Sequence, residues 1–264
     1  MSYHPYMKQT ILFLFTVAVL ARITTAAESP ESLIEKAVQA MGGKDAFYAK
    51  GSVEYEYTYR KEELGKEDIS TERYVFDGEK SWAHYTKREL LFPEVEGSMI
   101  QGYNGSQSWV TLDGQLSSQE DLLKRTDFMR KTNYYWFAMM FKLQDSGGVL
   151  TMEEPQEING INYHRVRLTF EDGVGDVKDI YVLYIHPETY LIDQFLFTIL
   201  DFGLTDPFLM EVEYTEHEGI QLSTTRRYIP SNWDAEIKGE HWVYEISKKI
   251  QFGKELPASL FEKP

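Results

Sequence analysis

The stretch from Asn133 to Leu143, NYYWFAMMFKL, constrains the fold more than any other part of the chain. It holds five aromatic side chains and one charge, that of Lys142. At helical spacing its apolar residues fall on every side, so no polar face remains. Five aromatic side chains bury roughly 150 to 250 Å² each, and their sum exceeds the roughly 300 to 600 Å² patch that a soluble monomer exposes. The stretch therefore predicts a helix that a sheet, a ligand or a partner must cover.

The N-terminal residues have the pattern of a signal peptide. A polar start with Lys8 precedes the apolar run Ile11 to Ala21, and small residues follow up to Ala27. The run is about half of the roughly 20 residues that a membrane helix needs. We therefore predict cleavage after Ala27, a signal peptide at 1–27, one domain at 28–264, and a secreted or periplasmic protein. After cleavage we expect no integral membrane segment.

Composition restricts the possible partners. The chain has no cysteine, so it lacks both a lipid-attachment cysteine and disulfides. Its net charge of -15 makes nucleic acid an unlikely partner and suits a basic protein partner. Aromatic residues make up 14% of the chain, and such bulk is typical of sheets.

Periodicity predicts the elements. Ser29 and Pro30 begin a helix that Gly42-Gly43 ends, and a helix that starts near Ser117 runs into the aromatic stretch. From Ser52 to Arg60, tyrosines alternate with polar residues, as in a strand with one buried face. In Ile180 to Ile185 both alternating sets are apolar, which predicts a strand covered on both faces. Further strands are predicted at 71–76, 81–86, 98–103, 108–112, 149–152, 162–170, 191–200, 208–214, 221–228 and 241–252.

These elements predict a mainly β fold. Short strands with tight turns favour an antiparallel meander. We expect a single, strongly curved antiparallel sheet of about eleven strands, an unclosed half-barrel with helices plugging its concave face.

The order of elements resembles a known type of protein. The residues that carry the resemblance are Gly42-Gly43, Phe76-Asp77-Gly78 with Trp82, Asn159-Gly160, Tyr163 to Val166, and Tyr184 to Thr189. Together they resemble a family of uncharacterised secreted bacterial proteins that is similar to the lipoprotein-carrier superfamily of LolA and LolB type. The resemblance implies a half-barrel that shields acyl chains. It also implies an arginine on the barrel lining that governs ligand release, to which we assign no position here.

Catalytic and metal patterns are missing from the sequence. It contains no G-x-S-x-G, no H-E-x-x-H and no P-loop. Glu211 and Glu213 share one strand face and could form a carboxylate pair, while Asp172, Asp176 and Asp179 could hold a hard cation in a loop. We favour an acidic strand edge and a hairpin turn for these two groups, and we expect no metal and no cofactor.

The sequence leads to one function hypothesis and two alternatives. The leading hypothesis is an extracytoplasmic, non-enzymatic binding protein or carrier for an acyl chain or lipid-like ligand. The alternatives are a hydrolase acting on carbohydrate or lipid through the Glu211/Glu213 face, and an interaction module with a filled barrel and an acidic docking surface. The aromatic helix is either permanent filling or a lid, and Phe202 to Phe208 is a second lid candidate. The predicted ligand-binding residues are Tyr134, Trp136, Phe137, Met140, Phe141, Tyr181, Tyr184, Phe202, Leu204 and Phe208.

Overall fold

The computed structural model describes residues 28–171 and 179–264, together with Met1. The predicted signal peptide thus falls outside the described residues, apart from Met1. The helices are α1 (Pro30–Ala40), α2 (Lys44–Tyr48) and α3 (Glu120–Lys142), with 3-10 helices η1 (Asp77–Glu79), η2 (Leu200–Phe202) and η3 (Ala258–Leu260). The strands are β1 (Ser52–Lys61), β2 (Lys66–Val75), β3 (Lys80–Lys87), β4 (Met99–Tyr103), β5 (Ser108–Leu112), β6 (Gln115–Leu116), β7 (Gly148–Ile158), β8 (Ile161–Phe170), β9 (Tyr181–Ile185), β10 (Ile192–Ile199), β11 (Leu204–His217), β12 (Ile220–Pro230) and β13 (Val243–Phe252).

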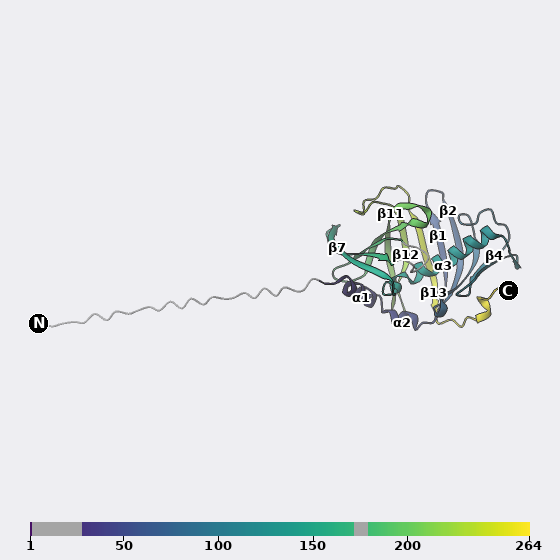
Figure 1. Ribbon diagram of the computed structural model, residues 1–264, viewed down its shortest axis with the longest axis horizontal. Coiled ribbons are helices and arrows are strands. Elements are labelled where there is room, and N and C mark those ends of the chain that lie inside the picture. The colour runs from purple at the N-terminus through teal and green to yellow at the C-terminus, as the bar shows by residue number, and fades with distance from the viewer. Residues whose placement is uncertain (2–27, 172–178) are drawn as a thin grey trace.

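The strands form one antiparallel sheet in the order β6-β5-β4-β3-β2-β1-β13-β12-β11-β10-β9-β8-β7. Over the described ranges β6 and β7 each pair with one neighbour, so the sheet is unclosed (Figure 1). The mainly β, antiparallel, unclosed architecture confirms that part of the sequence prediction. None of the described helices is both long enough and apolar enough to cross a bilayer.

Helix α1 forms for local reasons that the sequence shows. The Ser29 side chain accepts a hydrogen bond from the backbone N–H of Ser32 at 3.2 Å, and Pro30 occupies the first turn. Gly42 follows the helix with φ +107°, and a Cβ there would lie 2.5 Å from the carbonyl oxygen of Gly219. Only glycine fits this close approach, so the predicted helix end is confirmed.

Two strands behave as their patterns predict. In β1 the side chains of Val53, Tyr55 and Tyr57 are buried. In β9 every residue from Tyr181 to Ile185 is buried, because the strand is covered on both faces. Tyr181, Leu183 and Ile185 belong to the central core, whereas Val182 and Tyr184 pack in a second cluster.

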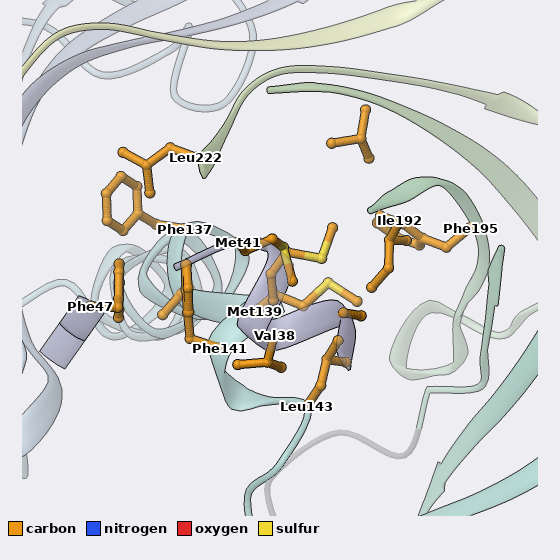
Figure 2. Close-up of a cluster of buried hydrophobic side chains, with 14 of the residues drawn as sticks. Val38, Met41, Phe47, Phe137, Met139, Phe141, Leu143, Ile192, Phe195 and Leu222 are labelled. Atoms are coloured by element: carbon orange, nitrogen blue, oxygen red, sulfur yellow. The ribbon is translucent and has the colours of Figure 1, made fainter. Parts of the chain in front are cut away.

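The central core lies between the sheet and the three helices. We call the side of the sheet against which they pack the helix face. Figure 2 shows side chains of α1, α2 and α3 converging with strand residues in this core. The rings of Phe47 in α2 and Phe141 in α3 stack at 4.1 Å with 4° between their planes. The aromatic stretch is therefore buried as predicted, with every residue from Asn133 to Leu143 buried or half-buried.

The opposite face of the sheet is covered by loops. The β12–β13 connection brings Trp233 and Trp242 over one part of it. At the C-terminus Phe261 is fully buried with Trp82 and Trp109, and the Trp109 ring N–H donates to the Phe261 carbonyl at 2.8 Å. These segments explain how strands of the sheet can be apolar on both faces.

The structure also differs from the expectations. The described residues form 13 strands against about eleven predicted, and neither the two-residue β6 nor the short helix α2 was predicted. Helix α3 begins at Glu120, and its N-cap Gln119 makes no side-chain capping bond. The predicted start near Ser117 is early because Ser117 instead accepts from the Gln119 N–H, at 3.3 Å, ahead of the helix.

Candidate ligand cavity

A cavity of about 930 Å³ lies beside α3 on the helix face. Its lining comes from α3, from η2, and from strands β1, β8, β9, β10, β12 and β13, among others. The volume is within the roughly 300 to 1,000 Å³ of typical small-molecule sites.

Trp136 of α3 forms one side of the cavity. Its ring lies 6.0 Å from Phe195 with the planes nearly parallel, and 5.3 Å from Phe197 with the planes nearly perpendicular. The Tyr181 ring lies 6.3 Å away. These spacings are in the range for favourable aromatic pairs, so Trp136 has a defined position against β9 and β10.

A pair of phenylalanines lies at the rim. Phe202 of η2 is 64% exposed, yet its ring meets that of Phe128 in α3 edge to face at 5.5 Å. Gly203 follows in the left-handed conformation, with φ +69°, and Leu204 is exposed as well. The contact joins α3 to the β10–β11 connection.

Polar groups lie in this aromatic lining or directly beside it. Arg226 of β12 and Glu245 of β13 are directly paired across the strands, and their charged groups are 2.7 Å apart. The hydroxyls of Tyr59 and Tyr228 are also 2.7 Å apart. Burial raises the pKa of Tyr59 to about 12, so the phenol is neutral at physiological pH.

A second charged group lies at the C-terminal end of α3. The Lys142 ammonium is 2.5 Å from Glu79 and 2.9 Å from Asp145, and Lys44 also binds Asp145. Burial by itself lowers the pKa of Lys142, but the hydrogen bonds that its ammonium donates to both carboxylates outweigh this effect and raise the pKa. Among the described residues the buried hydroxyl of Tyr134 has no hydrogen-bond partner.

A buried polar cluster fixes the position of α3. Arg130, 0% exposed, binds both carboxylate oxygens of Glu72 on β2, at 2.6 and 3.3 Å. Its Nε donates to Gln101 on β4 at 3.1 Å. Ser70 and Tyr74 donate to the same carboxylate at 2.7 and 3.0 Å. We call these five residues the anchor cluster; the charges in it are buried, paired and hydrogen-bonded.

The structure separates the ten predicted ligand-binding residues. Four line the cavity, three are core residues, and three lie elsewhere. Tyr134, Trp136, Tyr181 and Phe202 line it; Phe137, Met140 and Phe141 are in the core; Tyr184 packs in the second cluster, Leu204 is exposed, and Phe208 packs against Phe197 and Tyr228. Binding by any of them stays a prediction.

Several lining residues were not among the predicted set. Tyr57 and Tyr59 were predicted to face the core by their alternation on β1, and that signal could have identified them. Phe128 and Tyr228 had no such signal. The Arg226–Glu245 pair joins residues that meet only through strand pairing, and no local pattern predicts it.

The structure adds little support for the carboxylate pair and the aspartate group that the sequence offered as catalytic or metal sites. Glu211 is paired with Arg227 at 2.6 Å, while Glu213 is exposed. Asp172 and Asp176 lie outside the described residues, and Asp179 accepts hydrogen bonds from Thr198 and from the backbone of Leu200. In the described ranges no three acidic or histidine side chains are grouped as metal ligands.

The fold is similar to solved structures at low sequence identity. A LolA superfamily protein from Nitrosomonas europaea gives a TM-score of 0.54 at 13% identity, covering 90% of this chain and 99% of that one. A domain from Vibrio parahaemolyticus named for outer membrane lipoprotein sorting gives 0.52 at 11%, covering 86% and 97%. A DUF1329 family protein from Desulfovibrio piger gives 0.51 at 13%, covering 89% and 98%. The likeness shows a shared fold.

The sequence comparisons are more limited. The model of a family of unknown function, DUF6503, matches residues 8–249. A comparison with curated proteins finds no match. The resemblance to an uncharacterised family with a LolA-type fold is therefore confirmed.

Proposed function

The chain belongs to the DUF6503 family of unknown function, and we propose that it is a non-enzymatic binding protein or carrier for a hydrophobic ligand. The ligand class is an acyl chain or lipid moiety held in the cavity beside α3. The observation that supports this most is the cavity of about 930 Å³ with its aromatic lining. Burial of a chain there would contribute about 0.8 kcal/mol per CH₂ group.

The proposal includes a sheet that curves around α3 as a half-barrel. Strands β2 and β9 are six steps apart in the sheet order, which in a flat sheet corresponds to about 29 Å. Yet Tyr74 of β2 lies 5.4 Å from the Tyr134 ring, and Tyr181 of β9 lies 6.3 Å from the Trp136 ring. One turn of a helix about 10 to 12 Å across contacts both strands, which supports the curvature.

Export is part of the same proposal. The N-terminal pattern supports a signal peptide at 1–27 and a secreted or periplasmic protein, a location where a carrier meets lipid. Mass spectrometry of the exported protein should find a mature chain that begins at Glu28. Retention of Met1 would contradict cleavage.

The first test is native mass spectrometry of the mature protein purified without detergent. A stoichiometric adduct that denaturation releases, identified by lipid extraction, is the expected result. A protein that is bare and stays bare when offered fatty acids and phospholipids would overturn the carrier proposal.

A matched pair of variants in α3 tests the lining. Trp136→Ala removes a ring that borders the cavity, and should weaken binding of the fluorescent apolar probe N-phenyl-1-naphthylamine about tenfold, equal to about 1.4 kcal/mol. Phe141→Ala removes a core ring, 1% exposed, and should lower the unfolding free energy by about 3–5 kcal/mol with little effect on probe binding. Equal probe binding by wild type and Trp136→Ala would reject this lining.

A further inference from the structure

Three adjacent strands place a polar row in the floor of the cavity. Tyr59 of β1 lies opposite Glu245 of β13, which lies opposite Arg226 of β12. Tyr57 is two residues from Tyr59 and faces the same way. Tyr57, Tyr59 and Glu245 line the cavity, and Glu245 is only 7% exposed. A carboxylate therefore lies beside the tyrosines in this part of the lining.

Only some of the polar atoms in this row have hydrogen-bond partners within the protein. One Nη of Arg226 lies 2.7 Å from Glu245 and the other donates to the Trp136 carbonyl, while its buried Nε has no hydrogen-bond partner among the described residues. Over the described residues, the buried Oε2 of Glu245 has no hydrogen bond of standard geometry, although it lies 2.7 Å from Arg226, and the Tyr57 hydroxyl has none either. Burial first, and then the Glu245 charge, raise the pKa of Tyr57, so the phenol is a neutral donor close to a carboxylate.

A purely hydrocarbon ligand does not fit this floor. Covering a buried acceptor without a partner is costly, whereas a hydrogen bond to a charged group is among the stronger ones. A ligand carboxylate would also face the Glu245 charge. Two of the three lysines in the lining already have carboxylate partners, since Lys142 is bound by Glu79 and Asp145, and Lys131 by Asp127. The third, Lys61, lies 6.0 Å from the centre of the Tyr59 ring.

We propose that the ligand of this cavity is an amphiphile that inserts a neutral hydrogen-bond donor, a hydroxyl group, against Glu245 and Tyr57. The hydroxyl donates to the Glu245 carboxylate and accepts from Tyr57, while the apolar body lies along Trp136 and Phe197. This inference rests on the proposed function and narrows its ligand class from any lipid chain to a hydroxylated one.

The test compares three probes that differ at one end. 1-Dodecanol, methyl dodecanoate and dodecanoate each compete with N-phenyl-1-naphthylamine at pH 8, where the acid is ionised. Dodecanol should displace the fluorescent probe at a concentration about tenfold lower than methyl dodecanoate, because only the alcohol offers a donor. Dodecanoate should compete no better than the ester.

Two variants test whether Glu245 and Tyr57 cause the preference for dodecanol over the ester. Glu245→Gln should abolish the preference for dodecanol over the ester. Because that change leaves Arg226 without its charge partner and can unfold the protein, Tyr57→Phe is the second variant. It keeps the ion pair and should reduce the preference severalfold. Glu213→Gln, at an exposed position of neighbouring β11, is the control and should change nothing.

The outcomes distinguish a failure of the proposed carrier function from a failure of the hydroxyl inference. If the wild-type protein binds neither the fluorescent probe nor any competitor, the proposed function itself fails. If all three competitors bind equally, or dodecanoate binds best, the carrier proposal stands and the hydroxyl inference is overturned. An unchanged preference in folded Tyr57→Phe and Glu245→Gln would also overturn it.

Discussion

The side of α3 that packs on β2 and β4 is held by the buried anchor cluster, whereas the side toward β9, β10, β12 and β13 borders the cavity. On the first side Arg130 makes an ion pair and a side-chain hydrogen bond with groups that are fully buried. On the second, α3 contributes the half-buried Trp136 and the rim residue Phe128. Breaking the first contacts would leave charges without partners, while separating Phe128 from Phe202 would expose only apolar rings.

This difference between the two sides helps to decide whether α3 is a permanent part of the core or a lid that moves. A helix tied to the sheet by a buried ion pair cannot leave it without a large desolvation cost. We infer that α3 is a fixed support and that ligand passes at the Phe128–Phe202 rim, where Gly203 adopts a left-handed conformation and gives the connection freedom.

The largest effect is expected from breaking the anchor cluster. Arg130→Met leaves the fully buried Glu72 without its charge partner, so the unfolding free energy should fall by about 3–5 kcal/mol. Urea denaturation followed by tryptophan fluorescence measures this. Lys124→Met is the control in the same helix, because the Lys124–Glu120 pair is exposed and its loss should change stability little.

A double variant sharpens this result. Adding Glu72→Leu to Arg130→Met removes both charges and should restore much of the stability, since paired removal of buried ions is often tolerated. If Arg130→Met were no more destabilising than Lys124→Met, α3 would have no anchor on this side. The contrast between its anchored side and its cavity side would then be wrong.

An intermediate effect is expected at alkaline pH. The folded pKa of Tyr59, about 12 because of burial, is above the ordinary value near 10. Its contribution to stability is therefore complete below pH 10 and is lost as the pH rises from 10 to 12. Allowing for its partial exposure, the loss is roughly 2 kcal/mol. Tyr59→Phe should reduce the slope of stability against pH in this window by about one proton.

Tyr85 provides the matched position on the anchored side. It is only 6% exposed and packs away from the cavity, and burial raises its pKa strongly. The absorbance of tyrosinate should therefore show one fewer ionisation up to about pH 12 in Tyr59→Phe and no such change in Tyr85→Phe. Equal changes in both variants would mean that water reaches the two sides of α3 alike.

Local patterns were sufficient where the cause of the structure is local. The Ser29 cap and Gly42-Gly43 predicted α1, and the alternating tyrosines predicted β1. Where both sets of a strand are apolar, as in β9, period two cannot tell which set faces the helices. Tyr181 and Tyr184 were therefore both named as ligand-binding candidates, although they lie on opposite faces of the sheet.

The polar contacts of the site could not be predicted because they join residues that are far apart in the sequence. Arg130 meets Glu72 across 58 positions of the chain, and Arg226 meets Glu245 only through the β12–β13 register. A charged residue in a strand pattern usually indicates a solvated face. A charged residue that faces the core can be recognised only when its partner is known, and the pairing of strands across the whole sheet determines that partner.

The smallest but most discriminating effect is kinetic, and the absence of cysteine from the chain makes it accessible. Phe128→Cys with Phe202→Cys, joined by a thiol-cleavable bismaleimide, closes the rim. Exchange of N-phenyl-1-naphthylamine should slow about tenfold, as expected when a gating segment is held closed, and should recover on reduction. The control pair, Ser108→Cys with Asp127→Cys, joins α3 to β5 where the two native side chains are 2.7 Å apart. If α3 is a fixed support, this second link changes nothing, because it holds together elements that do not separate. If it stops exchange while the rim link does not, then α3 itself moves as the lid, and the anchor cluster must open each time a ligand enters.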